Sequence, residues 1–277
     1  MSYNYKSPAS SPFKLPQLPP HSYEVHHLLH RLLHEPTADQ NSIYSNMGQY
    51  WQLINLDKRQ TFGHWGKLAE FIPSDRPASI IPYLVVPASP LPQSTLNANA
   101  DLIGSWAGDR IICIGDYTDY RDYPKGLLTE AERRKITKTT SLYDIAYKKY
   151  DTVRPIRFPS PAAESMALAF AHDQVWVLRN LSKHQYVRVD ALGADPKHVR
   201  GPSTRWGSPG LGDVLLPRIM WTSETGQNYY EGEIGRRSWA GDRFDIQTLD
   251  TVEGDDEWKD ISMRVAREIE RNHDIYF

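Results

Sequence analysis

The hexapeptide Ser-Trp-Ala-Gly-Asp-Arg occurs twice in the chain, at Ser105–Arg110 and at Ser238–Arg243. A second shared segment lies upstream of each copy, at Trp51–Gln60 and at Trp176–Gln185, and both segments contain the pattern Trp-x-Leu-x-Asn-Leu. Because the order of the two motifs is kept, we interpret the sequence as an internal duplication. A duplicated chain is constrained to fold as two similar units, and we expect these to pack about a pseudo-twofold axis.

Each shared segment is expected to begin with a β-hairpin. In the second copy, Val175–Leu181 and Gln185–Leu192 are rich in β-forming residues and are joined through Ser182–Lys183. Ala-Gly-Asp in each hexapeptide is typical of a tight turn, because a glycine such as Gly108 can take the positive φ that a chain reversal needs. The tryptophans of the shared segments are expected in the core. They are Trp51, Trp106, Trp176 and Trp239.

Other segments also have predictable local structure. Thr129–Glu132 matches a capping box, which predicts that a helix begins there. We interpret Pro82–Pro92 as a surface loop and Val214–Leu216 as a strand that follows a flexible glycine-rich turn. Apolar residues at helical spacing predict an amphipathic helix at the C-terminus. They are Trp258, Ile261, Val265 and Ile269.

These patterns predict an α+β protein, in which two fused β-rich repeats carry flanking and connecting helices. The two repeats are expected to form one compact domain. In chain order, the predicted segments are a disordered tail rich in Pro and Ser (1–20), an amphipathic His-rich helix (21–36), the first repeat (45–125), a helical and Pro-rich connector (126–165), the second repeat (166–252) and the C-terminal helix (253–277).

Composition limits the class of partner and the cellular location. The 277 residues carry a formal net charge of −2, which argues against nucleic acid as a partner and against attraction to anionic lipid. The single cysteine, Cys113, lies in an apolar run and is interpreted as a small buried hydrophobic residue. No apolar run of about 20 residues and no signal-peptide pattern occurs. We therefore expect a soluble cytoplasmic protein without a membrane partner, with a nuclear location left open.

Charge is distributed unevenly along the chain. Arg121–Arg157 contains ten Lys or Arg residues against five Asp or Glu, whereas Glu253–Glu257 is acidic. A short basic run is most often a solvated helix face. The sequence leaves open whether the basic connector has a partner.

The strongest pattern for a metal site lies near the N-terminus. His26, His30 and His34 are four residues apart, so that neighbouring pairs on a helix can direct two imidazoles at one ion. No carboxylate or cysteine motif completes the ligand set, and these histidines oppose an apolar stripe, where a solvated face is the ordinary outcome. No functional metal or other cofactor is expected.

Common catalytic motifs are absent from the sequence, including the Gly-x-Ser-x-Gly elbow, the His-Glu-x-x-His helix and the phosphate loop. Under an enzymatic interpretation, the candidate acids and bases are carboxylates near the hexapeptides, joined by a histidine. These candidates are Asp109, Asp242, Asp116, His64 and His184. Under a structural interpretation, each hexapeptide Asp accepts backbone hydrogen bonds in the turn and pairs with the following Arg.

Aromatic residues in expected loops indicate where a ligand would bind. Rigid aromatic side chains provide contact area at low entropic cost. The glycine-rich segment around Trp206, present only in the second repeat, is the expected lip of a pocket. The candidate ligand-binding residues are Arg205, Trp206, Tyr229, Tyr230 and Trp65.

Four runs of the chain resemble a family of uncharacterised proteins from filamentous fungi and mushrooms. They are Tyr50–Arg59, Trp106–Tyr117, Trp176–Lys183 and Trp239–Ile246, and the likeness spans about residues 45 to 275. The resemblance implies a fungal protein that is not secreted. It brings no established activity and no catalytic residues. Some such proteins accompany genes of secondary metabolism, which implies an accessory or tailoring role.

Two functional interpretations follow from the sequence. The first is a noncatalytic binding or scaffold protein, which offers the groove between its repeats to an unknown protein or small-molecule ligand. The alternative is an enzyme that acts on a small organic molecule by acid–base chemistry, as a hydrolase, isomerase or cyclase. Carboxylates that converge in a deep pocket would favour the enzyme, and separated, paired turns would favour the scaffold.

Overall fold

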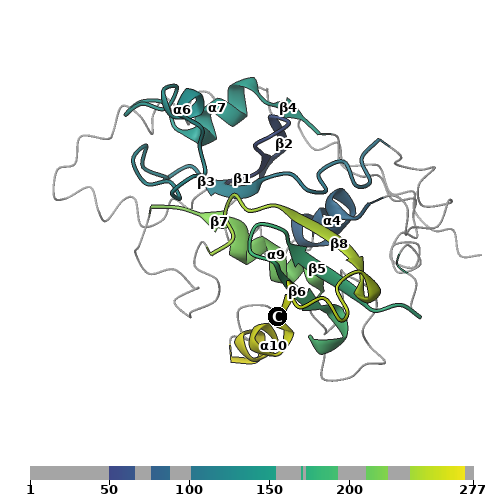
Figure 1. The fold of residues 1–277 in the computed structure, drawn as a ribbon. Coiled ribbons are helices and arrows are strands. Elements are labelled where there is room, and N and C mark those ends of the chain that lie inside the picture. The colour runs from purple at the N-terminus through teal and green to yellow at the C-terminus, as the bar shows by residue number, and fades with distance from the viewer. Residues whose placement is uncertain are drawn as a thin grey trace, which may run out of the picture. The chain divides into compact units, whose positions relative to one another are not determined.

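The structure is a computed structural model, and it describes residues 50–65, 76–87, 101–153, 170, 173–192, 210–223 and 238–271. The predicted tail (1–20) and His-rich helix (21–36) lie outside these residues. Both sheets and helices are present, so that the α+β fold class is confirmed (Figure 1). Among the described residues, no helix is long and apolar enough to cross a membrane.

The first sheet has five strands in the order β4-β2-β1-β3-β7. β1 (Trp51–Asn55) and β2 (Gln60–Trp65) form an antiparallel hairpin, and β3 (Ile111–Gly115) pairs antiparallel with the other edge of β1. Two short strands, β4 (Asp151–Thr152) and β7 (Met220–Trp221), extend the sheet in parallel at its two edges. β1 and β3 are buried along their whole length, as expected of central strands.

The second sheet has four strands in the order β8-β5-β6-β9. The hairpin of β5 (Trp176–Asn180) and β6 (Gln185–Arg188) is antiparallel, and β8 (Phe244–Thr248) pairs antiparallel with β5. The short β9 (Lys259–Asp260) joins β6 in parallel, as β4 joins β2 in the first sheet. The hairpin predicted around Ser182–Lys183 is confirmed, although Val189–Ala191 form a 3-10 turn, η1.

Helices α4 (Arg76–Val85) and α9 (Leu211–Ile219) pack against each other, and their buried residues share one core with both sheets (Figure 1). The strand predicted at Val214–Leu216 is therefore wrong, and the loop predicted from Pro82 is wrong for Pro82–Val85. An apolar run as short as Val214–Leu216 fits a buried strand or a buried helix equally well. Gly212 permits the close approach, because a Cβ there would lie 1.7 Å from the carbonyl oxygen of Ala78.

Three further helices lie at the margins. The capping box at Thr129 is confirmed, with both reciprocal bonds formed at the start of α6 (Glu130–Arg133). α7 (Leu142–Lys149) covers the face of the first sheet that carries Ile54 and Ile112. The predicted C-terminal helix is present as α10 (Ser262–Arg271), but it begins later than the predicted range, because β9 and the turn before it come first.

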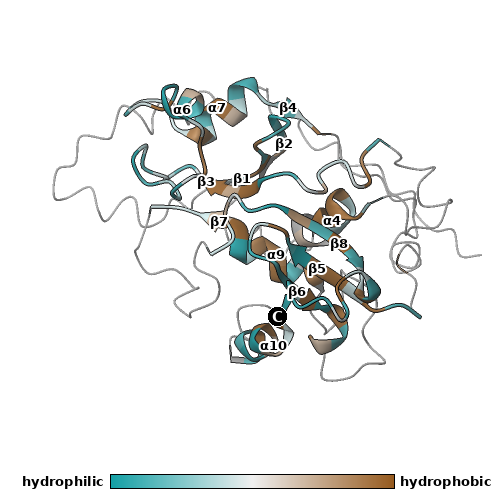
Figure 2. Ribbon diagram, viewed as in Figure 1, coloured by the Kyte–Doolittle hydropathy of each residue, from teal (hydrophilic) through white to brown (hydrophobic). Residues whose placement is uncertain are grey.

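The main core takes buried apolar residues from both sheets and from α4 and α9, and segments of these elements are coloured as hydrophobic in Figure 2. The four tryptophans of the shared segments are each at most 3 % exposed, which confirms their predicted burial. Cys113 is also fully buried, in the middle of β3. Burial raises the pKa of the Cys113 thiol well above its usual range, so that this residue is an inert part of the core.

The two hexapeptides meet, and each forms backbone hydrogen bonds with the strand that follows the other. The Gly108 N–H donates to the carbonyl of Phe244 at 2.7 Å, and the Gly241 N–H donates to the carbonyl of Ile111 at 2.8 Å. Arg110 and Arg243 form an antiparallel bridge at the centre of this contact. Each hexapeptide therefore closes on the strand that follows the other one, which ties the two sheets together through the backbone.

Candidate functional site

We define the paired-turn site as the two hexapeptide turns together with the loops of the two hairpins. Each hairpin loop has four residues between its closing pairs, Asn55 with Gln60 and Asn180 with Gln185. The last loop residue has a positive φ in both hairpins, 54° at Arg59 and 49° at His184. The asparagine side chain fixes each loop, because its Oδ1 accepts backbone N–H groups from the loop residues, including that of Lys58 at 2.9 Å.

In the first half of the site, a lysine and an asparagine hold the hexapeptide aspartate. Asn55 Nδ2 donates to Asp109 Oδ2 at 2.8 Å, and Lys58 Nζ lies 3.1 Å from the same oxygen. Lys58 Nζ also donates to the carbonyl of Ser105, at the start of the hexapeptide. The Asp109 carboxylate is thus bound to its own hairpin.

The second half repeats this arrangement atom for atom. Asn180 Nδ2 donates to Asp242 Oδ2 at 2.8 Å, and Lys183 Nζ bonds the same carboxylate oxygen. Lys183 Nζ also donates to the carbonyl of Ser238 at 2.7 Å. Both carboxylates therefore serve the same purpose, which is to lock a hexapeptide turn to a hairpin loop.

Gly108 and Gly241 have φ values of 78° and 80°, so that the predicted positive-φ turns are confirmed. The first hexapeptide also contacts the last turn of α4, where the carbonyl of Leu84 accepts the N–H of Trp106 at 2.7 Å. In the second half, the carbonyl of Arg218 accepts the N–H of Trp239 at 3.1 Å. The hexapeptides thereby satisfy helix C-terminal carbonyls that would otherwise lack partners.

The predicted pairing of each hexapeptide Asp with the following Arg is wrong. Both arginines instead reach Asp57 in the first hairpin loop, Arg110 through Nε at 2.7 Å and Arg243 through Nη1 at 2.7 Å. The turn directs each Asp toward its own hairpin, so that the neighbouring Arg must find its counter-ion elsewhere. The second hairpin has Ser182 at the position of Asp57, and its hydroxyl accepts only the backbone N–H of Arg243.

Asp57 is consequently the shared anion of the site. Partial burial raises the pKa of Asp57, but the hydrogen bonds and charge of Arg110, together with the charge of Arg243, lower it by more. The net pKa of this carboxyl therefore lies below its ordinary value. Asp57 remains ionised at neutral pH and compensates two guanidinium groups that lie next to each other.

The remaining catalytic candidates do not join this site. Asp116 follows the far end of β3 and accepts the N–H of Tyr50 at 3.1 Å, about five strand residues away from Asp109. His184 packs against Trp258, with ring centroids 5.5 Å apart. The backbone of His64 lies in β2 opposite Gln52, and its side chain is outside the described part of the structure.

Of the ligand-binding candidates, only Trp65 has a described backbone. It is the last residue of β2, so that its assignment to a loop is wrong. The strand continues to Trp65 because Trp65 pairs with Trp51 across the hairpin. The other candidates, Arg205, Trp206, Tyr229 and Tyr230, lie outside the described residues, as do His26, His30 and His34.

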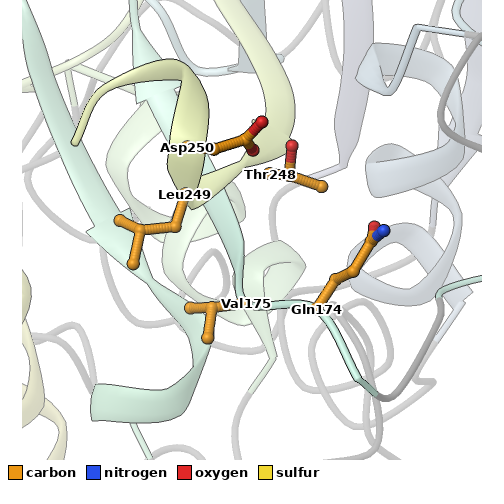
Figure 3. A pocket seen from close by; sticks show the side chains of 5 residues that line it. All are labelled: Gln174, Val175, Thr248, Leu249 and Asp250. Atoms are coloured by element: carbon orange, nitrogen blue, oxygen red, sulfur yellow. The ribbon is translucent and has the colours of Figure 1, made fainter.

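A shallow pocket lies next to the second sheet, away from the paired-turn site (Figure 3). Its volume is about 300 Å³, and it is open to solvent. Figure 3 shows the lining residues, which are Gln174 and Val175 just before β5, Thr248 at the end of β8, and Leu249 and Asp250 in the 3-10 turn η3 (Leu249–Thr251). Asp250 is the single ionisable residue in the lining, which offers neither an acid–base pair nor a set of metal ligands.

No group of three or more His, Cys, Asp or Glu side chains that could hold a metal ion occurs among the described residues. Sequence reasoning missed the asparagine and lysine of each hairpin loop, although Asn55 and Lys58 recur as Asn180 and Lys183 within the shared segment. Their identity in both copies was the available signal. Comparisons of the chain with protein-family models, with curated proteins and with solved structures found no match.

Proposed function

We propose that this chain is a noncatalytic binding or scaffold protein, built by duplication of a unit that contains one hairpin and one hexapeptide turn. The observation that carries the proposal is the matched fixation of Asp109 and Asp242. Each carboxylate is bound by an asparagine and a lysine of its own hairpin. A hydrogen-bond set that is the same in both halves is expected of a folding requirement, whereas catalytic roles usually diverge between copies.

Acid–base catalysis requires a side chain that reaches a bound substrate and exchanges a proton with it. In the paired-turn site, the two aspartates and Asp57 are engaged by lysines, asparagines and arginines of the protein itself. Asp116 lies at the opposite end of β3. The described carboxylates of this site are thus engaged by the protein itself, which favours the scaffold over the enzyme.

The duplication also supplies a reason for a binding role. Two hairpins tied through their hexapeptides present a rigid frame, and the connections that leave β3 and β8 differ in length and in sequence. Loops on a rigid frame are the usual location of binding residues. We propose an unknown protein or small-molecule ligand as the partner, in the interior of a fungal cell. An accessory role in secondary metabolism would be compatible with such a binding protein.

The test is native mass spectrometry of the untagged protein isolated from the cells that produce it, combined with the variants Asp109→Asn and Asp242→Asn. Because the contacts are matched, each variant should lose a similar stability, about 1 kcal/mol, and both should retain any copurifying protein chain. Lys58→Met and Lys183→Met are matched controls, which should give the same loss from the other side of each pair.

The enzyme would be indicated by a different pattern. A small organic molecule that the wild type converts, but that Asp109→Asn binds and leaves unconverted at an unchanged melting temperature, would contradict the proposal. Equal losses of stability in both aspartate variants, without a change in bound small molecules, would support it.

A further inference from the structure

A basic surface covers the connection between β3 and β4. We define it as six exposed cations that are held on α6, on α7 and on the turns beside them. These are Lys125, Arg133, Lys135, Lys138, Lys148 and Lys149. Within the described part of the chain, none of the six forms an ion pair. Unpaired cations on ordered elements leave a positive potential that the overall charge of the chain conceals.

The fold itself keeps the carboxylates of α6 and α7 away from these cations, because Glu130, Glu132 and Asp144 are engaged elsewhere. Glu132 caps α6 at Thr129 and approaches Arg110, and Glu130 pairs with Arg134. Asp144 caps α7, where it accepts the N–H of Ser141 at 2.9 Å. Glu130, Glu132 and Asp144 thus stabilise the helices of this connection, and the six basic residues face solvent.

An acidic surface covers the matching connection in the second half, between β8 and β9. We define it as five exposed carboxylates, Asp250, Glu253, Asp255, Asp256 and Glu257. The segment 249–258 contains no lysine or arginine, and among the described residues none of these carboxylates forms an ion pair. The surface is held in place by buried Val252 and by Trp258, whose ring lies 5.0 Å from the guanidinium of Arg179.

The two connections occupy equivalent positions in the topology. Each leaves the strand that follows a hexapeptide, and each leads into a short strand that pairs in parallel with the second strand of its hairpin. They differ in sign of charge, and both are attached to the frame by buried residues. The chain therefore carries two ordered surfaces of opposite charge in separate halves.

We propose that the basic surface of one copy of this chain docks on the acidic surface of a second copy. Charge complementarity identifies the occupant, since the five carboxylates on one surface match the cations on the other. The contact joins different surfaces of the two copies, so that it repeats head to tail and builds chains or rings rather than a closed twofold dimer. It stands independently of the proposed function, because it does not involve the paired-turn site.

A second copy of the chain would provide a partner of opposite charge for both the basic and the acidic surface. A nucleic acid would account only for the basic surface, and the acidic surface and the net charge of −2 would oppose its approach. Exposed ion pairs contribute little individually and are screened by salt, so that the association is expected to be weak and to depend strongly on ionic strength.

The first measurement is sedimentation velocity of the full chain over a range of protein and salt concentrations. At about 20 mM salt and about 100 µM protein, the weight-average mass should be at least about twice the chain mass. In about 0.5 M salt it should return to 31.8 kDa. A mass of 31.8 kDa under all conditions would overturn the proposal, and so would association that salt does not weaken.

Charge reversal separates this contact from other kinds of association. Lys135→Glu/Lys138→Glu removes positive charge from the basic surface, and Glu253→Lys/Asp256→Lys removes negative charge from the acidic surface. None of these four side chains makes a hydrogen bond or ion pair within the described residues, so that folding should be unaffected. Each double variant alone should be monomeric at low salt.

A mixture of the two double variants should associate again, because the reversed surface of one complements the reversed surface of the other. Asp101→Lys/Asp173→Lys reverses two exposed carboxylates outside both surfaces and should leave the association unchanged. Failure of the mixture to associate would contradict the proposal. Retention of a fluorescent single-stranded oligonucleotide by a wild-type chain that stays monomeric would also contradict it, and would assign the basic surface to nucleic acid.

Discussion

The two sheets share one hydrogen-bonded frame but differ on their outer faces. In the first sheet, Ile54 lies opposite Ile112 across the β1–β3 pair, and both are fully buried beneath α7. At the matching register of the second sheet, Arg179 lies opposite Asp245. This pair forms two charged hydrogen bonds, at 2.7 and 2.6 Å, and it lies beneath Trp258.

This difference separates the inward residues of each sheet, which are similar in both halves, from the outward residues, which are not. The inward residues of the pairs, Leu53 with Cys113 and Leu178 with Ile246, are apolar in both sheets. The polarity of the outward residues matches the element that covers them. Helix α7 covers the first sheet, and the short acidic connection covers the second. Cross-strand pairs on an outer face can therefore change from apolar to ionic, provided that both members change together.

The largest effect is expected when only one member of the apolar pair becomes charged. Ile112→Asp would bury a carboxylate without a partner under α7, and we expect a loss of about 4 to 5 kcal/mol in the free energy of unfolding. Urea denaturation followed by fluorescence measures this loss. A loss below about 2 kcal/mol would show that water reaches this face of the first sheet.

The second sheet provides the matched control. Arg179→Leu leaves the nearly buried Asp245 without a cationic partner, and should cost about 3 kcal/mol in the free energy of unfolding. The double variant Arg179→Leu/Asp245→Leu should lie within about 1 kcal/mol of the wild type, because an apolar pair at this register is the arrangement of the first sheet. If the double variant were less stable than Arg179→Leu alone, an apolar pair could not replace the ion pair on the outer face of the second sheet.

The hexapeptide tryptophans are expected to give the next largest effect. Trp106→Ala and Trp239→Ala should each lower the free energy of unfolding by about 3 to 5 kcal/mol, since both empty a fully enclosed site. Their polar contacts differ: Trp106 donates to Gln60 Oε1 at 2.9 Å, whereas the Trp239 ring faces Arg218 at 5.5 Å. Trp106→Phe should therefore cost about 1 kcal/mol more than Trp239→Phe. Losses below about 1 kcal/mol at both alanine variants would refute the matched core roles.

Much of the frame was predictable from local sequence. A shared motif with β-forming residues on both sides of Ser182–Lys183 defines a hairpin, and an Ala-Gly-Asp turn requires the positive φ found at Gly108 and Gly241. Local signals failed where burial decides the structure. Val214–Leu216 is apolar in either a helix or a strand, and its helical state follows from packing of α9 on α4 at Gly212.

The site was predicted only in part for a similar reason. The hexapeptide carboxylates were singled out, but their partners were not, because Asn55 and Asp109 are far apart in sequence. Side-chain direction at a turn depends on which hairpin lies beside it, and sequence spacing does not contain that information. The exchange of counter-ions, in which Asp57 takes both arginines, is a tertiary result of two turns that meet.

The two turn glycines offer a finer comparison. A Cβ at Gly108 would have no atom within 4 Å, so that Gly108→Ala should cost about 1 to 2 kcal/mol from its positive φ alone. A Cβ at Gly241 would lie 2.1 Å from Leu127 Cδ1, so that Gly241→Ala should cost more. Gly108→Val should also be worse than Gly108→Ala, because β-branching resists positive φ. Equal melting temperatures for the two Gly108 variants would remove the conformational argument.

The smallest predicted effect concerns the difference between Asp57 in the first hairpin and Ser182 in the second. Because the pKa of Asp57 is lower in the folded state, its contribution to stability is fully present above the ordinary carboxyl pKa of about 4. That contribution is lost as the pH falls through the folded-state pKa. Asp57→Ser gives the first loop the residue of the second, and should lower stability at neutral pH by about 1 kcal/mol or less.

The pH dependence of Asp57→Ser is the sharper readout, because it isolates the carboxyl. Melting temperatures from pH 5 down to pH 2 should fall less steeply for Asp57→Ser than for the wild type, so that the two curves converge in acid. Ser182→Ala should shift the whole curve without changing its slope, since the serine carries no charge. Parallel curves for Asp57→Ser and the wild type would contradict this prediction. They would mean that the charge of Asp57 does not contribute to stability through Arg110 and Arg243.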